Sequence, residues 1–257
     1  MRHLPNILTS VNLLCGCWAI VVLQSVNYDS SASINIVYVL FGLALVMDLL
    51  DGMVARLVNA YSELGKQLDS LADMVSFGVF PGFLWLKMFQ YSQLSLEPTF
   101  MFLPYLGFLF TLAVALRLAK FNIDERQSTD FLGIPSPAAA IFTLGLFHWV
   151  TNYPEVLYEV HPTMLMELGR GFLNPLLGMP WLLLLILLFI SAMMLIEIPM
   201  FSLKVKKWQW KGNELKVIFL VLSVILLGIW QLMALPLIIV LFILISIIRN
   251  YLVPKKD

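Results

Sequence analysis

The feature that most constrains this chain is a series of long apolar runs. Runs of about 18 or more apolar residues recur along the whole sequence, and each is long enough for a helix to cross a bilayer. Hydrophobic residues make up 60% of the 257 residues, and charged residues only 12%. A soluble domain of this length carries about twice that share of charge. The sequence therefore predicts an all-α polytopic membrane protein.

The apolar runs predict about eight membrane spans, preceded by a short interfacial helix over residues 1–7. We expect a six-helix core in residues 1–198, and a cytoplasmic loop with two additional transmembrane helices in residues 199–257. The expected spans are 8–26, 34–57, 67–90, 100–120, 136–152, 178–198, 215–232 and 235–252.

The basic residues predict an orientation. With an even number of spans, fourteen of the sixteen Lys and Arg residues fall on the same side as the N-terminus. Only Lys87 and Arg170 fall on the opposite side. Because cytoplasmic loops carry the excess of Lys and Arg, both termini and the turn that follows Arg56 are expected to face the cytoplasm. We expect a bacterial cytoplasmic membrane.

Four aspartates stand out against this apolar background. Asp48 and Asp51 lie near the end of the second expected span, and Asp69 and Asp73 lie near the start of the third. A carboxylate at membrane depth costs several kcal/mol unless it is paired or binds a cation. Arg56 alone does not neutralise four acids, whereas divalent metal ions with oxygen ligands would.

The spacing of these acids predicts that they converge. Asp48 and Asp51 are three residues apart and share one face of a helix, and Asp69 and Asp73 are four apart and share a face of the next. The short turn between the two helices would make them antiparallel neighbours. Small residues, among them Gly65, leave room for a ligand. The plainer interpretation is a helix pair with incidental interfacial acids, which would lie at helix ends facing water.

These residues carry a resemblance. The string D-x(2)-D-G-x(2)-A-R-x(8)-G-x(3)-D-x(3)-D fits from Asp48 to Asp73 without a gap and resembles the signature of the CDP-alcohol phosphotransferases. This resemblance implies a transfer of a phosphatidyl group from a CDP-linked lipid, a site for two divalent ions (Mg²⁺ or Mn²⁺) and a homodimer. The family resemblance implies that metal is bound by Asp48, Asp51, Asp69 and Asp73. It also makes Asp73 the base that accepts the proton of the acceptor hydroxyl.

The resemblance further implies a nucleotide and phosphate site. Arg56 would hold phosphate oxygens, and small residues of the motif would border the nucleotide. At the N-terminus, three polar residues at helical spacing would meet the cytidine, although Asn6 or Thr9 would serve equally well as a helix cap. The expected set is Asn6, Thr9, Asn12, Gly52, Ala55, Arg56, Gly65 and Ser70.

The flanking stretches resemble the membrane-integral phosphatidylserine synthase branch of the family. This implies serine as the acceptor, and Arg117, Lys120 and Ser136 as its candidate ligands. A bidentate pair between Arg117 and the serine carboxylate would explain an arginine here, and so would a side chain that reaches to the membrane surface. The branch has Arg where this chain has Lys120, so a role there does not transfer directly. Ser136 precedes Pro137 and equally fits a helix start.

Two alternatives stay open at this stage. The same chemistry with glycerol 3-phosphate or inositol as acceptor would be expected to place more basic residues near Arg117. A cation transporter would place acids toward both membrane faces, whereas here they cluster toward one. We therefore expect CDP-diacylglycerol, L-serine and membrane lipids as partners, and no nucleic acid.

Overall fold

The computed structural model describes residues 3–25, 31–60, 62–92, 101–123, 131–151, 179–200 and 213–252. These residues are almost entirely helical. The long helices are α1 (Leu4–Ser25), α2 (Ser31–Leu57), α3 (Glu63–Asp73), α4 (Phe80–Tyr91), α5 (Phe108–Ile123), α6 (Ser136–Thr151), α8 (Pro180–Leu195), α9 (Glu214–Trp230) and α10 (Ala234–Leu252). Short elements complete the described fold: η1 (Met74–Val79), η4 (Leu103–Gly107), η7 (Gln231–Met233) and the two-residue strands β1 (Phe131–Leu132) and β2 (Pro199–Met200).

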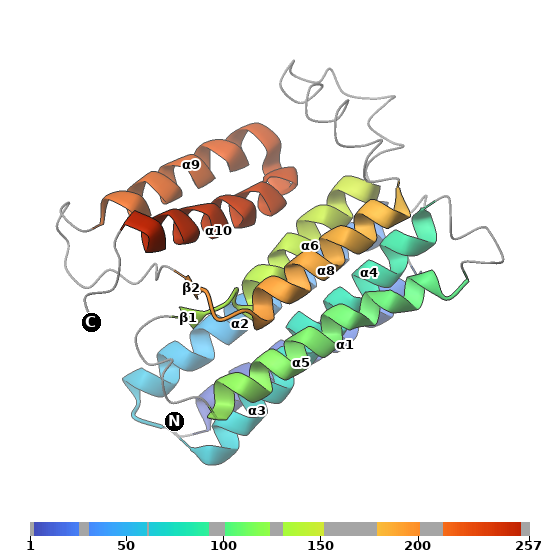
Figure 1. Cartoon of the computed structure of the whole chain (residues 1–257). Helices are drawn as coiled ribbons and strands as arrows, with labels where there is room; N and C mark the ends of the chain where they lie inside the picture. The colour runs from blue at the N-terminus through green and yellow to red at the C-terminus, as the bar shows by residue number, and fades with distance from the viewer. Residues whose placement is uncertain are drawn as a thin grey trace.

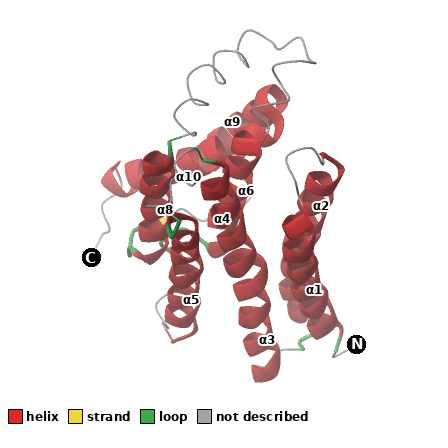
Figure 2. Cartoon of the chain, turned by 90° about the vertical axis from the view of Figure 1, so that its right-hand side faces the viewer, coloured by secondary structure: helices red, strands yellow, loops and turns green. Residues whose placement is uncertain are grey.

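The helices lie side by side with their chain directions alternating (Figure 1). α1 packs along α2, α5 along α8, and α10 against α6. α3, η1 and α4 follow one another without a break, so residues 63–91 form one long helical segment (Figure 2). This arrangement brings the end of α2 and the start of α3 to the same end of the molecule as the first turn of α1.

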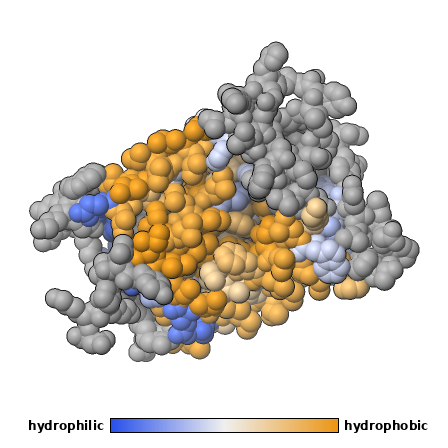
Figure 3. All heavy atoms as spheres, turned by 45° about the horizontal axis from the view of Figure 1, so that its top comes forward, coloured by the Kyte–Doolittle hydropathy of each residue, from blue (hydrophilic) through white to orange (hydrophobic). Residues whose placement is uncertain are grey.

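Five of the described helical segments are long and apolar enough to cross a membrane: Leu4–Ser25, Ser33–Leu57, Glu63–Tyr91, Leu103–Ile123 and Glu214–Asn250. The last contains both α9 and α10. Pro180–Leu195 is a shorter apolar helix. Apolar residues also dominate the outer surface of the helices (Figure 3), as expected for side chains in contact with lipid. The chain is therefore an integral membrane protein. Within the described residues each of the eight expected spans is mainly helical, and the number of spans stays a prediction.

The start of α1 differs from expectation. The expected short interfacial helix over residues 1–7 is not a separate element, because α1 begins at Leu4 and continues unbroken to Ser25. The reason is the position of Pro5 in the first turn of α1. A proline there loses no intrahelical hydrogen bond, so the helix continues through it.

Close contact between α1 and η1 fixes the packing beneath the polar end of the molecule. A Cβ atom added to Gly16 would come within 2.5 Å of Ser76 Oγ and 3.0 Å of Ser76 Cα. Glycine therefore lets the two helices approach closely. Ser76 is fully buried, and its hydroxyl donates a hydrogen bond to the backbone carbonyl of Asn12 at 3.0 Å. The α1–η1 spacing is thus set by direct contact.

A second close contact joins the segment before α6 to the end of α8. β1 and β2 pair antiparallel, with Phe131 opposite Met200 and Leu132 opposite Pro199. Gly133 follows with a positive φ of 71°, and a Cβ added there would lie 2.7 Å from the carbonyl oxygen of Met194. Only glycine fits this conformation and this contact without strain. The backbone of residues 131–134 is therefore held against the carboxyl end of α8.

The C-terminal pair α9–α10 is joined to the remaining helices through α10. Gly145 of α6 lies so close to α10 that an added Cβ would come within 2.5 Å of Pro236 Cδ. Trp149 Nε1 donates to the carbonyl oxygen of Met233 at 2.7 Å, and Asn250 Nδ2 donates to that of Pro199 at 2.7 Å. The expected division between residues 1–198 and 199–257 stays a prediction, and the two parts share a packed interface.

Candidate functional site

The acidic residues lie where α2 ends and α3 begins. Asn59, with a positive φ of 48°, lies in the turn that reverses the chain. Ser62 then caps α3, since its side chain accepts the backbone N–H of Gly65 at 3.0 Å. A capped start of this kind satisfies a backbone donor that the helix itself leaves unpaired. The turn therefore sets α3 antiparallel to α2, with the acids of both helices at one end.

Three of the four predicted acids form a compact group. Asp48, Asp51 and Asp69 each offer one carboxylate oxygen, and these three oxygens lie within 4.8 Å of one another. Asp73 does not belong to this group of three, but its carboxyl is in hydrogen-bonding contact with that of Asp48. The four carboxyl groups thus converge as the spacing predicted, with Asp73 placed deeper along α3.

The environment of these oxygens fits a cation. Asp69 Oδ1 is buried and has no hydrogen-bond partner among the described residues. Asp51 accepts a hydrogen bond of 2.6 Å from Thr9 Oγ1, which orients it. Grouped carboxylates with a buried unpaired oxygen repel one another unless positive charge lies between them. An all-oxygen set without His or Cys suits a hard divalent ion.

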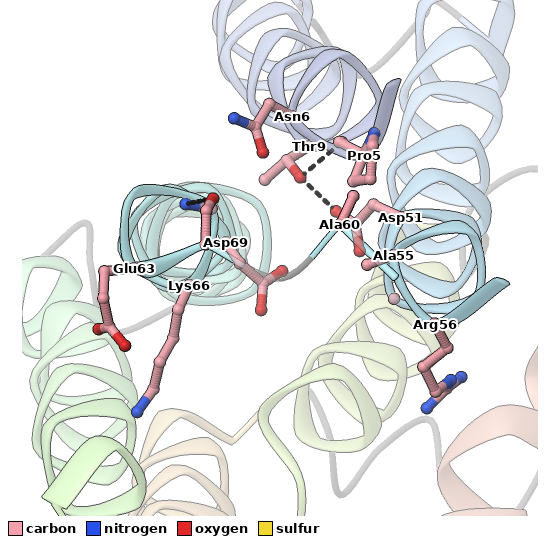
Figure 4. A pocket seen from close by; sticks show the side chains of 13 residues that line it. Pro5, Asn6, Thr9, Asp51, Ala55, Arg56, Ala60, Glu63, Lys66 and Asp69 are labelled. Carbon is pink, nitrogen blue, oxygen red and sulfur yellow. Dashed lines mark hydrogen bonds between the residues drawn. The ribbon is translucent and has the colours of Figure 1, made fainter. Parts of the chain in front are cut away.

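A cavity of about 580 Å³ opens beside these acids (Figure 4). The figure shows the carboxylate of Asp69 extending from α3 toward α2, and Arg56 and Lys66 on opposite sides of the opening. Volumes of this order are typical of ligand pockets. The described residues that line the cavity are Pro5, Asn6, Thr9, Asp51, Gly52, Ala55, Arg56, Ala60, Ser62, Glu63, Gly65, Lys66 and Asp69.

Most of the predicted nucleotide-binding residues line this cavity. They are Asn6, Thr9, Gly52, Ala55, Arg56 and Gly65. A Cβ added at Gly52 would meet nothing within 4 Å, so this position leaves open space, whereas one at Gly65 would come within 3.0 Å of Asn6 Oδ1. Their binding roles stay predictions, but the structure brings all six together.

Two predicted nucleotide-binding residues are not among those that line the cavity. Asn12 is fully buried, and its Nδ2 lies 3.4 Å from Asp73 Oδ1. Ser70 turns toward α5, where Asn122 Nδ2 donates to Ser70 Oγ at 2.9 Å. Helical spacing placed both residues near the acids, but packing with α3 and α5 gives them protein partners.

Glu63 and Lys66 line the cavity and were not predicted. Both lie in the first turn of α3, on either side of Gly65. Lys66 Nζ lies 3.5 Å from the carbonyl oxygen of Asn122 on α5. Their closeness to Gly65 in the sequence could have predicted this, since residues next to a glycine that borders a ligand are themselves near that ligand.

The predicted acceptor-binding residues lie elsewhere. Arg117 is 7% exposed, and its Nε donates to the carbonyl oxygen of Ile134 at 2.6 Å. Lys120 forms an ion pair with Glu197 at 2.9 Å. The cavity beside these two basic residues has a volume of about 10 Å³, enough for one water molecule and not for an amino acid. Ser136 is buried at the start of α6. Acceptor binding by these residues stays a prediction, and the observed contacts of Arg117 and Lys120 join α5 to its neighbours.

Comparison with known proteins agrees with this geometry. The family model for CDP-alcohol phosphatidyltransferase matches residues 2–173. The CDP-diacylglycerol–serine O-phosphatidyltransferase of Bacillus subtilis is 36% identical over 145 residues, which are 55% of this chain and 73% of that protein. Proteins of the same description in Helicobacter pylori J99 and Methanocaldococcus jannaschii are 32% identical over 164 residues and 33% over 150.

The matched parts cover 60% and 58% of this chain, respectively, and 63% of each of these two relatives. The match to the family includes the whole acidic motif and ends before α8. It therefore contains every described residue that lines the cavity. This chain belongs to the CDP-alcohol phosphatidyltransferase family.

Proposed function

We propose that this protein transfers the phosphatidyl group of CDP-diacylglycerol to the hydroxyl of L-serine, giving phosphatidylserine and CMP. The observation that carries the proposal is the group of Asp48, Asp51 and Asp69, whose oxygens lie within 4.8 Å of one another beside a cavity of about 580 Å³. Membership of the family supports the reaction class. The choice of serine is supported by the names of the relatives.

The reaction requires one P–O bond to form and another to break. The serine hydroxyl oxygen attacks the phosphorus that carries diacylglycerol, the bond from that phosphorus to CMP breaks, and CMP leaves with the electron pair. Asp73 is the proposed acceptor of the serine hydroxyl proton. Its contact with Asp48 supports this role, because a base has to lie close to the metal-binding acids that would align the attacking hydroxyl.

The other residues bind and orient. The four aspartates would hold two divalent ions, Mg²⁺ or Mn²⁺, which when bound supply positive charge against the pyrophosphate. Thr9 orients Asp51 through its 2.6 Å hydrogen bond. Arg56, exposed at the opening, would hold phosphate oxygens, and the open space at Gly52 admits the nucleotide. Asn6, Ala55 and Gly65 complete the proposed nucleotide site.

We also propose that the site faces the cytoplasm of a bacterial cell. Arg56, Lys66 and Arg249 lie at helix ends or in first turns, on the side that the distribution of basic residues assigns to the cytoplasm. The diacylglycerol tails would then stay in the bilayer while CMP leaves to water. Homodimer formation stays a proposal based on the family resemblance, and crosslinking of the protein in membranes tests it.

Acceptor specificity tests the proposed function. Purified protein is given CDP-diacylglycerol with Mg²⁺ or Mn²⁺ and, in parallel, L-serine, glycerol 3-phosphate or inositol. We expect CMP release and a new phospholipid with serine, and neither when a chelator is added. Efficient CMP release with glycerol 3-phosphate or inositol and not with serine would reject the acceptor and keep the family chemistry.

A further inference from the structure

Asn12 is a residue of α1 that lies next to Asp73. It follows Thr9 by three residues on α1, is fully buried, and is not among the described residues that line the cavity. Asn6, six residues earlier, does line it, and its Oδ1 lies near Gly65. The two asparagines of α1 therefore have different surroundings, one beside the ligand space and the other against α3 and η1.

The contacts of Asn12 lead to Asp73. Its Nδ2 lies 3.4 Å from Asp73 Oδ1, and its backbone carbonyl accepts the hydroxyl of Ser76 at 3.0 Å. If the amide were turned over, two oxygens would face each other, which needs a proton or a cation between them. The orientation with nitrogen toward the carboxylate is the one that hydrogen bonding selects. In either orientation the side chain of Asn12 meets Asp73.

The amide of Asn12 is only half satisfied. Its Oδ1 is buried without a hydrogen-bond partner among the described residues. Buried amides that serve packing alone have their polar atoms paired, because an unpaired one costs free energy. Asn12 is also neutral, so it donates to a carboxylate in a crowded acidic group without changing the charge that a cation meets. These features fit a residue whose role is to hydrogen-bond the carboxylate of Asp73.

We propose that Asn12 is a positioning residue for Asp73, a role that rests on the proposed function. The N–H of the Asn12 amide holds the Asp73 carboxylate in place through Oδ1, and the carboxyl of Asp48 also contacts it. This fixes which oxygen of Asp73 is presented to the cation and to the acceptor hydroxyl. Such outer-shell hydrogen bonds orient ligands and tune the affinity for metal.

Two substitutions and one matched control test the proposal. Asn12→Leu removes the amide at similar size, and Asn12→Asp keeps the shape but places an oxygen against Asp73. Ser76→Ala is the control, because it removes a buried hydrogen bond between the same two helices, at the backbone of the same residue, without touching a carboxylate. The measurements are kcat and KM for CMP release, and the Mn²⁺ concentration that gives half of the maximal thermal stabilisation.

We expect both Asn12 variants to lower kcat by about 10- to 100-fold, with KM for CDP-diacylglycerol nearly unchanged. Asn12→Leu should raise the half-saturating Mn²⁺ concentration by about tenfold. Ser76→Ala should lower the unfolding temperature and leave kcat and the Mn²⁺ midpoint as in the wild type. If Asn12→Leu does not fold, Asn12→Asp carries the kinetic test, since its size fits the same space.

Three results would overturn the proposal. One is wild-type kcat and Mn²⁺ midpoint in a folded Asn12 variant. Another is a raised KM for CDP-diacylglycerol at unchanged kcat, which would indicate direct contact with the nucleotide. A third is the same loss in Ser76→Ala as in Asn12→Leu, which would indicate a packing role. If the wild type releases no CMP with any acceptor, the proposed function fails, and the Mn²⁺ midpoints of the variants still decide whether Asn12 acts on the acidic group.

Discussion

Two groups of buried polar side chains lie at the same end of this molecule, and they differ in the space beside them. Around Asp48, Asp51 and Asp69, like charges converge beside a cavity of about 580 Å³, and one carboxylate oxygen is buried without a described partner. Around Arg117, Nε donates to the carbonyl oxygen of Ile134 at 2.6 Å, Nη2 is buried without a partner among the described residues, and the adjoining cavity has a volume of about 10 Å³.

This difference helps to distinguish a ligand-binding site from buried polar residues that only join helices of a membrane protein. Both groups carry ionisable residues in apolar surroundings, which in sequence makes each a candidate site. The acidic group remains incomplete without positive charge and has space for a ligand. The hydrogen bond of Arg117 is to the backbone carbonyl of Ile134 and joins α5 to the segment that leads into α6. Each group leaves one polar atom buried without a partner among the described residues, Asp69 Oδ1 and Arg117 Nη2, so the free volume beside the acids is what marks the ligand site.

The largest effect is expected from Asp69→Asn, which tests whether the acidic group binds metal or only has a structural role. It removes one of three converging carboxylates, so we expect CMP release to fall by roughly 10²–10³-fold through lost electrostatic stabilisation. Without added metal the variant should unfold at a higher temperature than the wild type, because repulsion is relieved. Glu63→Gln, which neutralises an exposed acid at the cavity, is the control and should keep most of the activity. Full activity of Asp69→Asn would refute the metal site.

Arg117→Ala tests whether Arg117 stabilises the fold or binds the acceptor serine. Loss of the hydrogen bond to Ile134 leaves a buried carbonyl unpaired, which should destabilise the protein by about 1–3 kcal/mol. Thermal unfolding in detergent measures this, and KM for serine in the folded fraction should change little. Arg117→Lys should be destabilised as well, because an ammonium does not reproduce the guanidinium contact. A KM for serine raised about tenfold at unchanged stability would instead support the predicted acceptor role.

Asn122→Ala tests whether a contact between α3 and α5, next to the acidic group, contributes to stability. Asn122 on α5 donates to Ser70 Oγ at 2.9 Å, and Ser70 directly follows Asp69. We expect a loss of about 1 kcal/mol of stability. Ser70→Ala removes the same contact and also the hydrogen bond from Ser70 Oγ to the carbonyl oxygen of Lys66 at 3.2 Å, and the double variant should lose less than the sum of the two single variants, since both remove the contact between Ser70 and Asn122. Thr111→Val is a matched control that removes another hydrogen bond of α5, to the carbonyl oxygen of Gly78 at 2.9 Å. Additive losses in the Asn122–Ser70 double variant would show that the contact contributes nothing.

The smallest effect is expected for the ion pair between Lys120 and Glu197. Their side chains are 49% and 48% exposed, so water and salt screen the interaction. Lys120→Ala should change the free energy of unfolding by at most about 1 kcal/mol, and less at high salt. Unfolding at two ionic strengths measures this. A larger loss, independent of salt, would mean that Lys120 has a role beyond the ion pair.

The helical segments, and the residues that share one face of a helix, could be predicted from the amino-acid sequence alone. The apolar runs predicted the helices, and the three- and four-residue spacings of the aspartates predicted that the acids converge, as Asp48, Asp51 and Asp69 do. Both inferences depend on periodicity along one helix or on the short turn between two. Local spacing is sufficient for them because neighbouring segments fix their own geometry.

The neighbour that each helical face contacts could not be predicted from the sequence and is seen in the folded protein. Asn12 and Ser70 have helical positions suited to the cavity, yet one meets Asp73 and the other Asn122. Arg117 meets Ile134, and Glu63 and Lys66 join the cavity lining. These contacts are between segments that are far apart in the chain or depend on the rotation of a whole helix about its axis. That rotation is set by close packing, as between Gly16 and Ser76, and no local pattern encodes it.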